Sequence, residues 1–317
     1  MPLILVLLGI GALLIAGATR KRPQWLRSLT SGLLISYVTL LIMGAAIEGY
    51  FRFIHYDTFG GKASENWRAR YWHTNSAGYR DREWLPEDWA GKTTVAVVGD
   101  SFAAGWGVDD PADRFSDVLG GLLGDDYFVF NLAVPGTSTP QQLEHLQAAP
   151  TTPNIVILQY FLNDIDYAVM SQGLQILLPE PPTALRDLYM VDFVYSLLVN
   201  GMDRDYWEWE YGNYDNFVLW DIHRAQLEAF IDYTERIDAR LIVVIFPNLR
   251  DPVGSIAYVD RVAFVFQDRG IETLKLFDAV AEWTPEAVVV SPRDAHPNAA
   301  FHRYVGERLH ALFFYAE

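Results

Sequence analysis

The stretch VVGDSF, residues 97–102, ends a short apolar run and opens a polar turn. The run itself, Thr94–Val98, has the β-branched composition typical of a buried strand. In an open α/β sheet, functional groups gather beyond the carboxyl ends of the strands. A serine in a tight, glycine-containing turn into a helix exposes its hydroxyl and places its N–H at the helix start. Ser101 is therefore a candidate nucleophile with an oxyanion donor, although Asp100-Ser101 alone also fits a helix cap.

Short apolar runs recur along the chain and alternate with segments that have helical spacing. The further runs are Phe128–Leu132, Ile155–Tyr160, Leu241–Phe246 and Thr273–Phe277. The helical segments are Phe115–Leu123, Ile222–Ile237, Ile256–Phe266 and Ala299–Phe313. This alternation predicts an α/β domain built on a parallel sheet.

Three more motifs lie at predicted strand–helix junctions. They are NLAVPG at residues 131–136, FLND at 161–164 and DAHPN at 294–298. The carboxyl ends of parallel strands meet at one edge of a sheet. We therefore expect Ser101, Gly136, Asn163 and His296 to converge on that edge.

Together these motifs resemble the SGNH, or GDSL-like, hydrolase and acyltransferase family, over residues 93–314. The resemblance implies a three-layer, flavodoxin-like α/β fold with a parallel sheet. The stretch NSAGYR, residues 75–80, also resembles a segment that precedes the domain in many bacterial membrane-attached members.

The resemblance also implies a role for each matching residue. Ser101 would be the nucleophile, His296 its general base, and Asp294 the group that orients the imidazole. The N–H groups of Ser101 and Gly136 and the side-chain amide of Asn163 would form the oxyanion hole. Asp164 would brace the loop.

The resemblance implies no cofactor and no metal. An alternative metal site on Asp294, His296 and His302 has no cysteine and no HExxH pattern to support it.

The sequence departs from the family pattern in two places. The third motif usually has Gly two residues before the Asn, and here that residue is Phe161. Its ring would narrow the acyl pocket or displace the loop, which bears on the oxyanion role of Asn163. The spacing of Asp294 and His296 is one residue tighter than the commonest form.

Charge is unevenly distributed along the 317 residues. The formal net charge is −16, which argues against nucleic-acid binding and against docking on anionic lipid through a basic patch. Residues 1–47 hold four basic residues and no acidic ones, so residues 48–317 carry −20. The absence of cysteine excludes disulfides, zinc fingers and iron–sulfur clusters.

Two uncharged runs, residues 2–18 and 28–47, are each long enough to cross a bilayer and predict a two-helix transmembrane hairpin. All four positive charges lie between them, in residues 19–27, which places that loop in the cytoplasm. We therefore expect a protein of the inner (cytoplasmic) membrane whose soluble domain faces the periplasm or cell exterior. A cleaved signal peptide ending near Ala16-Gly17-Ala18 is the alternative, but no positive region precedes the apolar run.

The predicted organisation has three parts. Residues 1–50 form the hairpin, 51–92 an extended linker packed on the domain, and 93–317 the α/β domain. An aromatic-rich insertion at about residues 168–216 interrupts the α/β alternation. It could be a lid, a sugar-stacking surface or a membrane-facing patch, or its aromatics could simply cover the sheet.

The expected function is that of a membrane-anchored serine esterase or O-acyltransferase. It would act on acyl esters of cell-envelope carbohydrate, or on a lipid ester, through an acyl-serine intermediate. The alternative is a catalytically silent subunit of a membrane complex, with the hairpin as a surface for a membrane-protein partner.

Overall fold

The computed structural model describes residues 2–19, 21–59, 61–281 and 283–315. Some residues of the predicted hairpin, linker and α/β domain lie outside the described residues: Met1, Arg20, Gly60, Glu282, Ala316 and Glu317. The chain divides into two compact units. We call Met1–Arg70 with Leu177–Met202 the helical unit, and Tyr71–Ile176 with Asp203–Glu317 the sheet unit.

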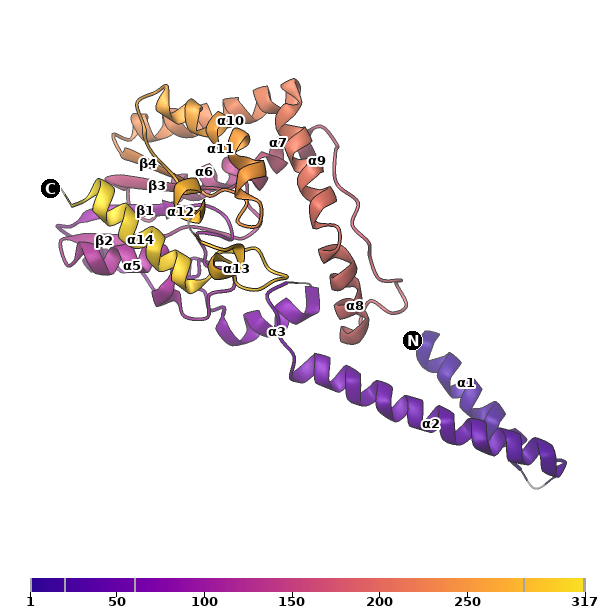
Figure 1. Ribbon diagram of the computed structural model, residues 1–317. Coiled ribbons are helices and arrows are strands. Elements are labelled where there is room, and N and C mark those ends of the chain that lie inside the picture. Colours follow the sequence, from indigo (N-terminus) through magenta and orange to yellow (C-terminus); the bar gives the residue numbers. More distant parts are fainter. Residues whose placement is uncertain (1, 20, 60, 282, 316–317) are drawn as a thin grey trace. The chain divides into compact units, whose positions relative to one another are not determined.

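The sheet unit is built on a parallel sheet, as the sequence predicts (Figure 1). Its described strands lie in the order β2-β1-β3-β4-β5. They are β1 (Thr93–Val98), β2 (Tyr127–Asn131), β3 (Ile155–Tyr160), β4 (Arg240–Ile245) and β5 (Glu272–Lys275). Every residue of β3 is buried, which explains its continuous apolar run. The order reverses between β1 and β3, and functional groups of α/β folds gather at such a switch point.

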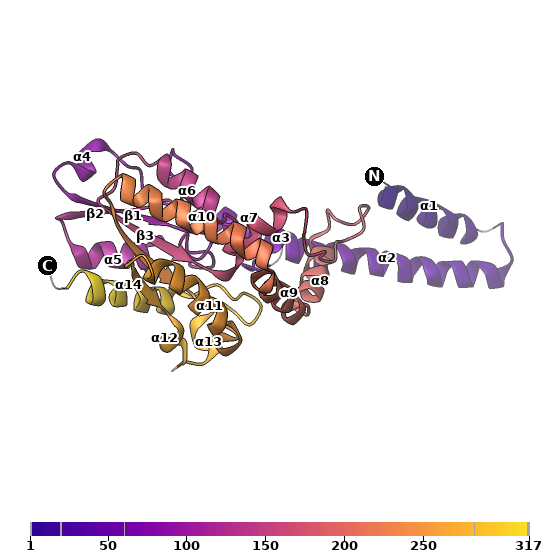
Figure 2. The same ribbon diagram turned by 90° about the horizontal axis from the view of Figure 1, so that it is seen from above.

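Helices cover both faces of this sheet, with α6 and α10 on one face and α5 and α14 on the other (Figure 2). The helical elements before the insertion are α4 (Pro86–Trp89), η1 (Pro111–Asp113), α5 (Phe115–Leu123), α6 (Thr139–Gln147), η2 (Leu162–Ile165) and α7 (Asp166–Ser171). Those after it are α9 (Asp203–Asp215), α10 (Phe217–Arg236), α11 (Pro252–Gln267), α12 (Phe277–Ala281), α13 (Pro285–Val288) and α14 (Ala299–Phe313). The predicted α/β class is therefore confirmed.

The segment after Ser101 differs from the prediction. Residues 101–107 form consecutive turns, and the next regular helix, α5, begins only at Phe115. Gly105 and Gly107 have φ values of 72° and 84°, a backbone region that interrupts a right-handed helix. The fifth predicted strand also ends early, at Lys275, because Phe277 begins α12.

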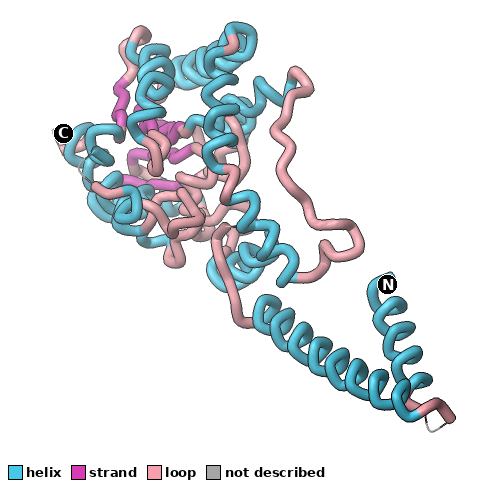
Figure 3. The backbone as a smooth tube through the Cα atoms, turned by 45° about the vertical axis from the view of Figure 1, so that its right-hand side comes forward, coloured by secondary structure: helices cyan, strands magenta, loops and turns pink. Residues whose placement is uncertain are grey.

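The helical unit contains α1 (Pro2–Gly17), α2 (Gln24–Phe53), α3 (Gly61–Tyr71, whose last residue belongs to the sheet unit) and α8 (Tyr189–Asn200). Helices α1 and α2 run antiparallel, side by side (Figures 1 and 3). The Tyr37 hydroxyl on α2 donates to the Leu7 carbonyl on α1 at 2.6 Å. Among the described residues, α2 alone is both long and apolar enough to cross a membrane, while α1 is a shorter apolar helix. A second span in α1 therefore stays a prediction.

Region 51–92, predicted to be extended, contains the end of α2 and the helices α3 and α4. In α3, Ala63 and Trp67 are four residues apart and both are buried. Arg68 and Arg70 in its last turn favour the helix electrostatically. Only these two residues of α3 are buried, so the sequence gives a weak apolar signal for this helix.

The aromatic insertion is divided between the two units. Helix α8 belongs to the helical unit and α9 to the sheet unit. On α9, Trp207 and Tyr214 are buried and belong to the apolar core. These aromatics are thus part of the folded sheet unit.

The contact between α14 and α5 tests the packing of the sheet unit. A Cβ on Gly306 would lie 2.8 Å from Val118 Cγ1 and 2.9 Å from the Phe115 carbonyl oxygen. We predict that Gly306→Ala lowers the free energy of unfolding by about 1–3 kcal/mol through overpacking. Urea unfolding of the detergent-solubilised chain measures this change.

Gly212→Ala on α9 is the matched control, because a Cβ there meets nothing within 4 Å. It should raise the free energy of unfolding by up to about 1 kcal/mol through helix propensity. Equal effects of the two substitutions would contradict the packing argument.

Candidate active site

The turn after β1 requires a glycine at position 99. A Cβ on Gly99 would lie 2.3 Å from Oε1 of Gln159, the fifth residue of β3. That oxygen accepts hydrogen bonds from the N–H groups of Asp100 and Ala103, both at 3.1 Å. Gln159 therefore fixes the backbone on both sides of Ser101.

The Asp100 side chain stabilises the same turn through a hydrogen bond inside it. Its carboxylate accepts a hydrogen bond from Phe102 N–H at 2.8 Å, and the residue is fully buried. Burial raises the pKa of Asp100, while the Phe102 N–H, the His296 charge and the side chains of Gln159 and Asn163 lower it in part. The Ser101 N–H has no acceptor among the described residues, so it is available to an oxygen bound beside the serine hydroxyl.

Ser101, His296 and Asp294 form one hydrogen-bonded chain. The distance from His296 Nε2 to Ser101 Oγ is 2.8 Å, and that from His296 Nδ1 to Asp294 Oδ1 is 2.5 Å. The same Asp294 oxygen accepts the His296 backbone N–H at 3.1 Å, which fixes the ring beside the carboxylate. Asp294 is buried, whereas 25% of the His296 side chain is exposed. The structure thus brings these three predicted residues together.

The electrostatics of His296 suit a base that accepts a proton. Burial lowers the pKa of His296, but the charge and hydrogen bond of Asp294, with a further contribution from Asp100, outweigh this effect. The net pKa therefore lies above the ordinary value of 6.5. An imidazole in this setting can take the Ser101 hydroxyl proton and hold it as a stabilised imidazolium.

The Gly136 loop is attached to the turn that carries Ser101. Val134 N–H and the Thr137 hydroxyl both donate to the Gly99 carbonyl, at 3.2 Å and 3.4 Å. Gly136 is exposed, has a φ of 76° and has no acceptor for its N–H among the described residues. Its loop therefore lies at the predicted edge of the sheet.

Asn163 and Asp164 follow β3 within η2. Asp164 is fully buried, and it accepts from Gln142 Nε2 at 2.6 Å and from Phe161 N–H at 3.2 Å. It therefore holds the loop in place. The Asn163 side chain lies against the Asp100 carboxyl and lowers its pKa.

His302 has a structural environment. It is fully buried, and its Nδ1 accepts the Phe115 N–H at 3.3 Å. Burial lowers the pKa of His302 to about 3, so the ring is neutral. Within residues 2–19, 21–59, 61–281 and 283–315, no three His, Asp or Glu side chains are grouped to hold a metal ion.

Arg80 supports the turn after Ser101, a role that the sequence motifs did not assign. Its buried guanidinium donates to the carbonyls of Gly105 at 2.6 Å, Val108 at 2.7 Å and Tyr71 at 3.0 Å. The planar fork of an arginine suits several carbonyls at fixed angles. The stretch NSAGYR at residues 75–80 was the available signal, and its arginine reaches the loop beyond the candidate nucleophile.

Aromatic rings form one wall of the site. Phe161 stacks on Phe102 with ring centres 4.0 Å apart, and Phe102 lies 5.2 Å from the His296 ring. Trp207 contacts Phe161 in a T-shaped arrangement, with ring centres 5.5 Å apart. Phe161, the departure from the family pattern, thus lies between the insertion helix α9 and the residues beside Ser101.

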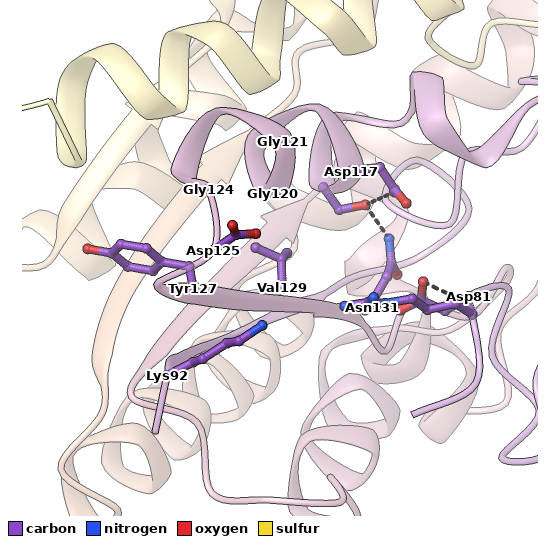
Figure 4. A pocket seen from close by; sticks show the side chains of 12 residues that line it. Asp81, Lys92, Asp117, Gly120, Gly121, Gly124, Asp125, Tyr127, Val129 and Asn131 are labelled. Atoms are coloured by element: carbon purple, nitrogen blue, oxygen red, sulfur yellow. Dashed lines mark hydrogen bonds between the residues drawn. The ribbon is translucent and has the colours of Figure 1, made fainter. Parts of the chain in front are cut away.

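A polar cavity of about 350 Å³ lies elsewhere, along β2 and α5 (Figure 4). Its lining includes Asp81, Asp117 and Asn131, but neither Ser101 nor His296. Asp81 accepts the Asn131 N–H at 2.8 Å, and Asp117 pairs with Arg114 at 2.9 Å. These three side chains thus already have partners in the fold.

Comparison with known proteins places this site in a family. Residues 97–304 match the sequence model of the GDSL-like lipase/acylhydrolase family. No curated protein sequence matches the chain.

Similar solved structures include the psychrotrophic esterase EstA from Pseudoalteromonas sp., with 13% identity over 69% of this chain and 96% of that one, and a TM-score of 0.43. A carbohydrate acetylesterase family member from Sinorhizobium meliloti has 15% identity over 69% and 96%, with a TM-score of 0.40. An acetyl xylan esterase has 12% identity over 70% and 100%, with a TM-score of 0.46.

The Asp294–His296 contact predicts a measurable change in protonation. Asp294→Asn should lower the pKa of His296, because a neutral amide no longer stabilises the imidazolium while burial still disfavours it. Titration of ¹³C-labelled histidine by NMR measures this, with the His296 signal assigned from His296→Gln. The Asp278→Asn variant on α12 is the control and should leave the signal unchanged. An unshifted His296 pKa in Asp294→Asn would contradict the electrostatic account.

Proposed function

Because the chain belongs to the GDSL-like lipase/acylhydrolase family, we propose that it is an esterase that works through an acyl-serine intermediate on Ser101. The observation that carries the proposal is the hydrogen-bonded chain from Ser101 Oγ through His296 to Asp294, at 2.8 Å and 2.5 Å. This order of hydroxyl, imidazole and carboxylate is the one that activates a serine for attack on a carbonyl carbon.

The first half of the reaction forms the acyl-enzyme. Ser101 Oγ attacks the ester carbonyl while its proton moves to His296 Nε2, and Asp294 stabilises the imidazolium. The oxyanion is held by the N–H groups of Ser101 and Gly136 and by the Asn163 amide, where one lost donor typically costs about 2.7–4 kcal/mol. The bond to the leaving alcohol then breaks, and His296 returns the proton to that oxygen.

The second half releases the acyl group. His296 takes a proton from an acceptor hydroxyl, which attacks the acyl carbon and regenerates Ser101. Water as acceptor gives hydrolysis, and a sugar hydroxyl gives O-acyl transfer. The side chains that handle the proton are the same in both cases.

The proposed substrate is an acyl ester of cell-envelope carbohydrate. Helix α2 would anchor the protein in the inner membrane, and the basic residues Lys21, Arg22 and Arg27 favour a cytoplasmic loop between α1 and α2. The sheet unit, which contains Ser101, would then face the periplasm or cell exterior, near envelope polysaccharide. A lipid ester at the membrane surface would be reachable for the same reason.

A catalytically silent subunit is the second candidate. Phe161 fills space beside the site, and the anchor helices carry small residues that leave room for a partner. A Cβ on Gly9, Gly32 or Gly44 would meet nothing within 4 Å, so these faces permit close packing of another transmembrane helix. Reactivity of Ser101 discriminates between the two candidates.

Labelling with a fluorophosphonate tests the nucleophile directly. We predict that the solubilised protein is labelled and hydrolyses p-nitrophenyl acetate, and that Ser101→Ala abolishes both. Ser64→Ala, which removes a hydroxyl on α3, should change neither. Labelling that persists in Ser101→Ala would refute the nucleophile, and an unlabelled wild-type protein that co-purifies with a membrane partner would favour the silent subunit.

The ring of Phe161 should select short acyl groups. We predict that Phe161→Ala raises the ratio of kcat/KM for p-nitrophenyl hexanoate over acetate by about tenfold or more, because it opens apolar space beside Phe102. Phe217→Ala, on an exposed ring of α10, should leave that ratio unchanged. If both variants kept the wild-type ratio, Phe161 would have no part in acyl selection.

A further inference from the structure

A second cavity lies between α9 and the loop that follows β4. It has a volume of about 290 Å³ and is lined in part by Trp207, Glu208 and Tyr211 of α9 and by Asn248 and Arg250 of the loop. All of these residues belong to the sheet unit, and the proposed reaction uses none of them. A cavity of this size lies near the lower end for small-molecule sites.

Arg250 connects this cavity to the catalytic residues. Its Nη2 donates to the Pro292 carbonyl at 2.8 Å, two residues before Asp294 in the same loop. Its Nη1 pairs with Asp203 Oδ1 at 3.2 Å, at the start of α9. The Arg250 charge also lies close enough to His296 to lower the pKa of that ring.

Aromatic rings make a second connection. Trp207 contacts Phe161 edge-on at 5.5 Å, and Phe161 stacks on Phe102 beside His296. The lining of the cavity thus reaches the catalytic residues through two aromatic rings, Phe161 and Phe102, and through the loop that holds Asp294.

One part of the cavity is a rigid aromatic surface. Trp207 and Tyr211 have ring centres 5.7 Å apart, and Tyr211 stacks on Tyr258 at 4.6 Å with an interplanar angle of 7°. The Tyr211 hydroxyl accepts a hydrogen bond from the Asn248 side chain at 3.3 Å. The half-buried Tyr211 ring is therefore held in one orientation, and the small accessible part of Trp207, tilted by 35° against it, adds apolar carbon to the same wall.

The other part of the cavity is polar and carries both signs of charge. Glu208 and Arg204 form an exposed pair at 3.5 Å, with 69% and 83% of their side chains accessible. Asp203 and Asp251 add carboxylates, and Arg250 adds a second guanidinium. Such a mixture can donate to and accept from several hydroxyl groups at once.

We propose that this cavity binds a sugar ring of the ester substrate, with the ring's carbon face on the Trp207–Tyr211 surface and its hydroxyls on the charged wall. This inference rests on the proposed esterase function and adds the site that recognises the alcohol part of the ester. An acyl chain would offer no hydrogen-bonding groups to the charged wall. A phosphorylated ligand would meet three carboxylates and two guanidinium groups that are already paired with carboxylates, so the wall offers it no free positive charge.

The test compares esters with and without a sugar. The substrates are p-nitrophenyl acetate and a panel of 6-O-acetylglucose, 6-O-acetyl-N-acetylglucosamine and acetylated xylotriose. We expect Glu208→Gln and Tyr211→Ala each to raise KM for at least one sugar ester by about tenfold, the loss of one good contact. Turnover of p-nitrophenyl acetate should stay within about twofold of wild type, because it leaves the sugar cavity empty.

Glu228→Gln is the matched control. Glu228 is a half-buried residue of α10 that pairs with Arg224 at 3.4 Å in an i,i+4 arrangement, as Glu208 does with Arg204. It should leave KM for every substrate unchanged. An equal loss on p-nitrophenyl acetate and on the sugar esters in the cavity variants would overturn the proposal, since it would indicate general disturbance of the site.

Calorimetry of glucose, N-acetylglucosamine and xylotriose with the Ser101→Ala protein keeps the two proposals separable. Sugar binding that Tyr211→Ala weakens would support the cavity even if no ester were hydrolysed, in which case the esterase proposal fails. Turnover of p-nitrophenyl acetate with neither sugar-ester turnover nor sugar binding would overturn the cavity proposal and leave the esterase intact.

Discussion

The close approach of Gln159 to Gly99 is the constraint on which the candidate site depends. Any side chain at position 99 would collide with Gln159 Oε1, which holds the N–H groups of Asp100 and Ala103 at 3.1 Å. The carboxyl ends of β1 and β3 are neighbours in the sheet, so this contact transfers the rigidity of two buried strands to the turn. Ser101 therefore meets His296 in a geometry that the core of the sheet determines.

The far side of the same turn depends on a residue outside the family-matched region. Arg80 donates to the carbonyls of Gly105 and Val108, which lie four and seven residues after Ser101. Hydrogen bonds from a charged donor are worth roughly 1.5–3 kcal/mol each. The segment at residues 75–80 is thus part of the folded site, although the family match begins only at residue 97.

Sequence patterns predict the elements whose signal is local. The helices Phe115–Leu123 and Ala299–Phe313 and the strand Ile155–Tyr160 lie at their predicted residues, because each has an uninterrupted apolar period. Ser101 follows a strand, as predicted, whereas Asp294 and His296 were expected at a strand–helix junction and lie between α13 and α14 instead. The grouping of Asp294 with Ser101 and His296 was implied by the family resemblance. The support from Arg80 and the cavity beside α9 depend on contacts between residues far apart in sequence, which no local period encodes. The turns after Ser101 were missed because glycine conformation, and not hydrophobic spacing, determines them.

The formal net charge of −16 counts every Asp and Glu as ionised, and several of these carboxyl groups are buried. Burial raises the pKa of Asp164 and of Glu210 well above the ordinary values, and raises that of Asp166 to about 6. A raised carboxyl pKa stabilises the fold at low pH, and this contribution is lost as the pH rises through the folded value. Asp164 and Glu210 therefore keep their protons to a higher pH than exposed carboxyl groups do. Asp294, paired with His296, carries the charge that stabilises the imidazolium during the proposed proton transfer.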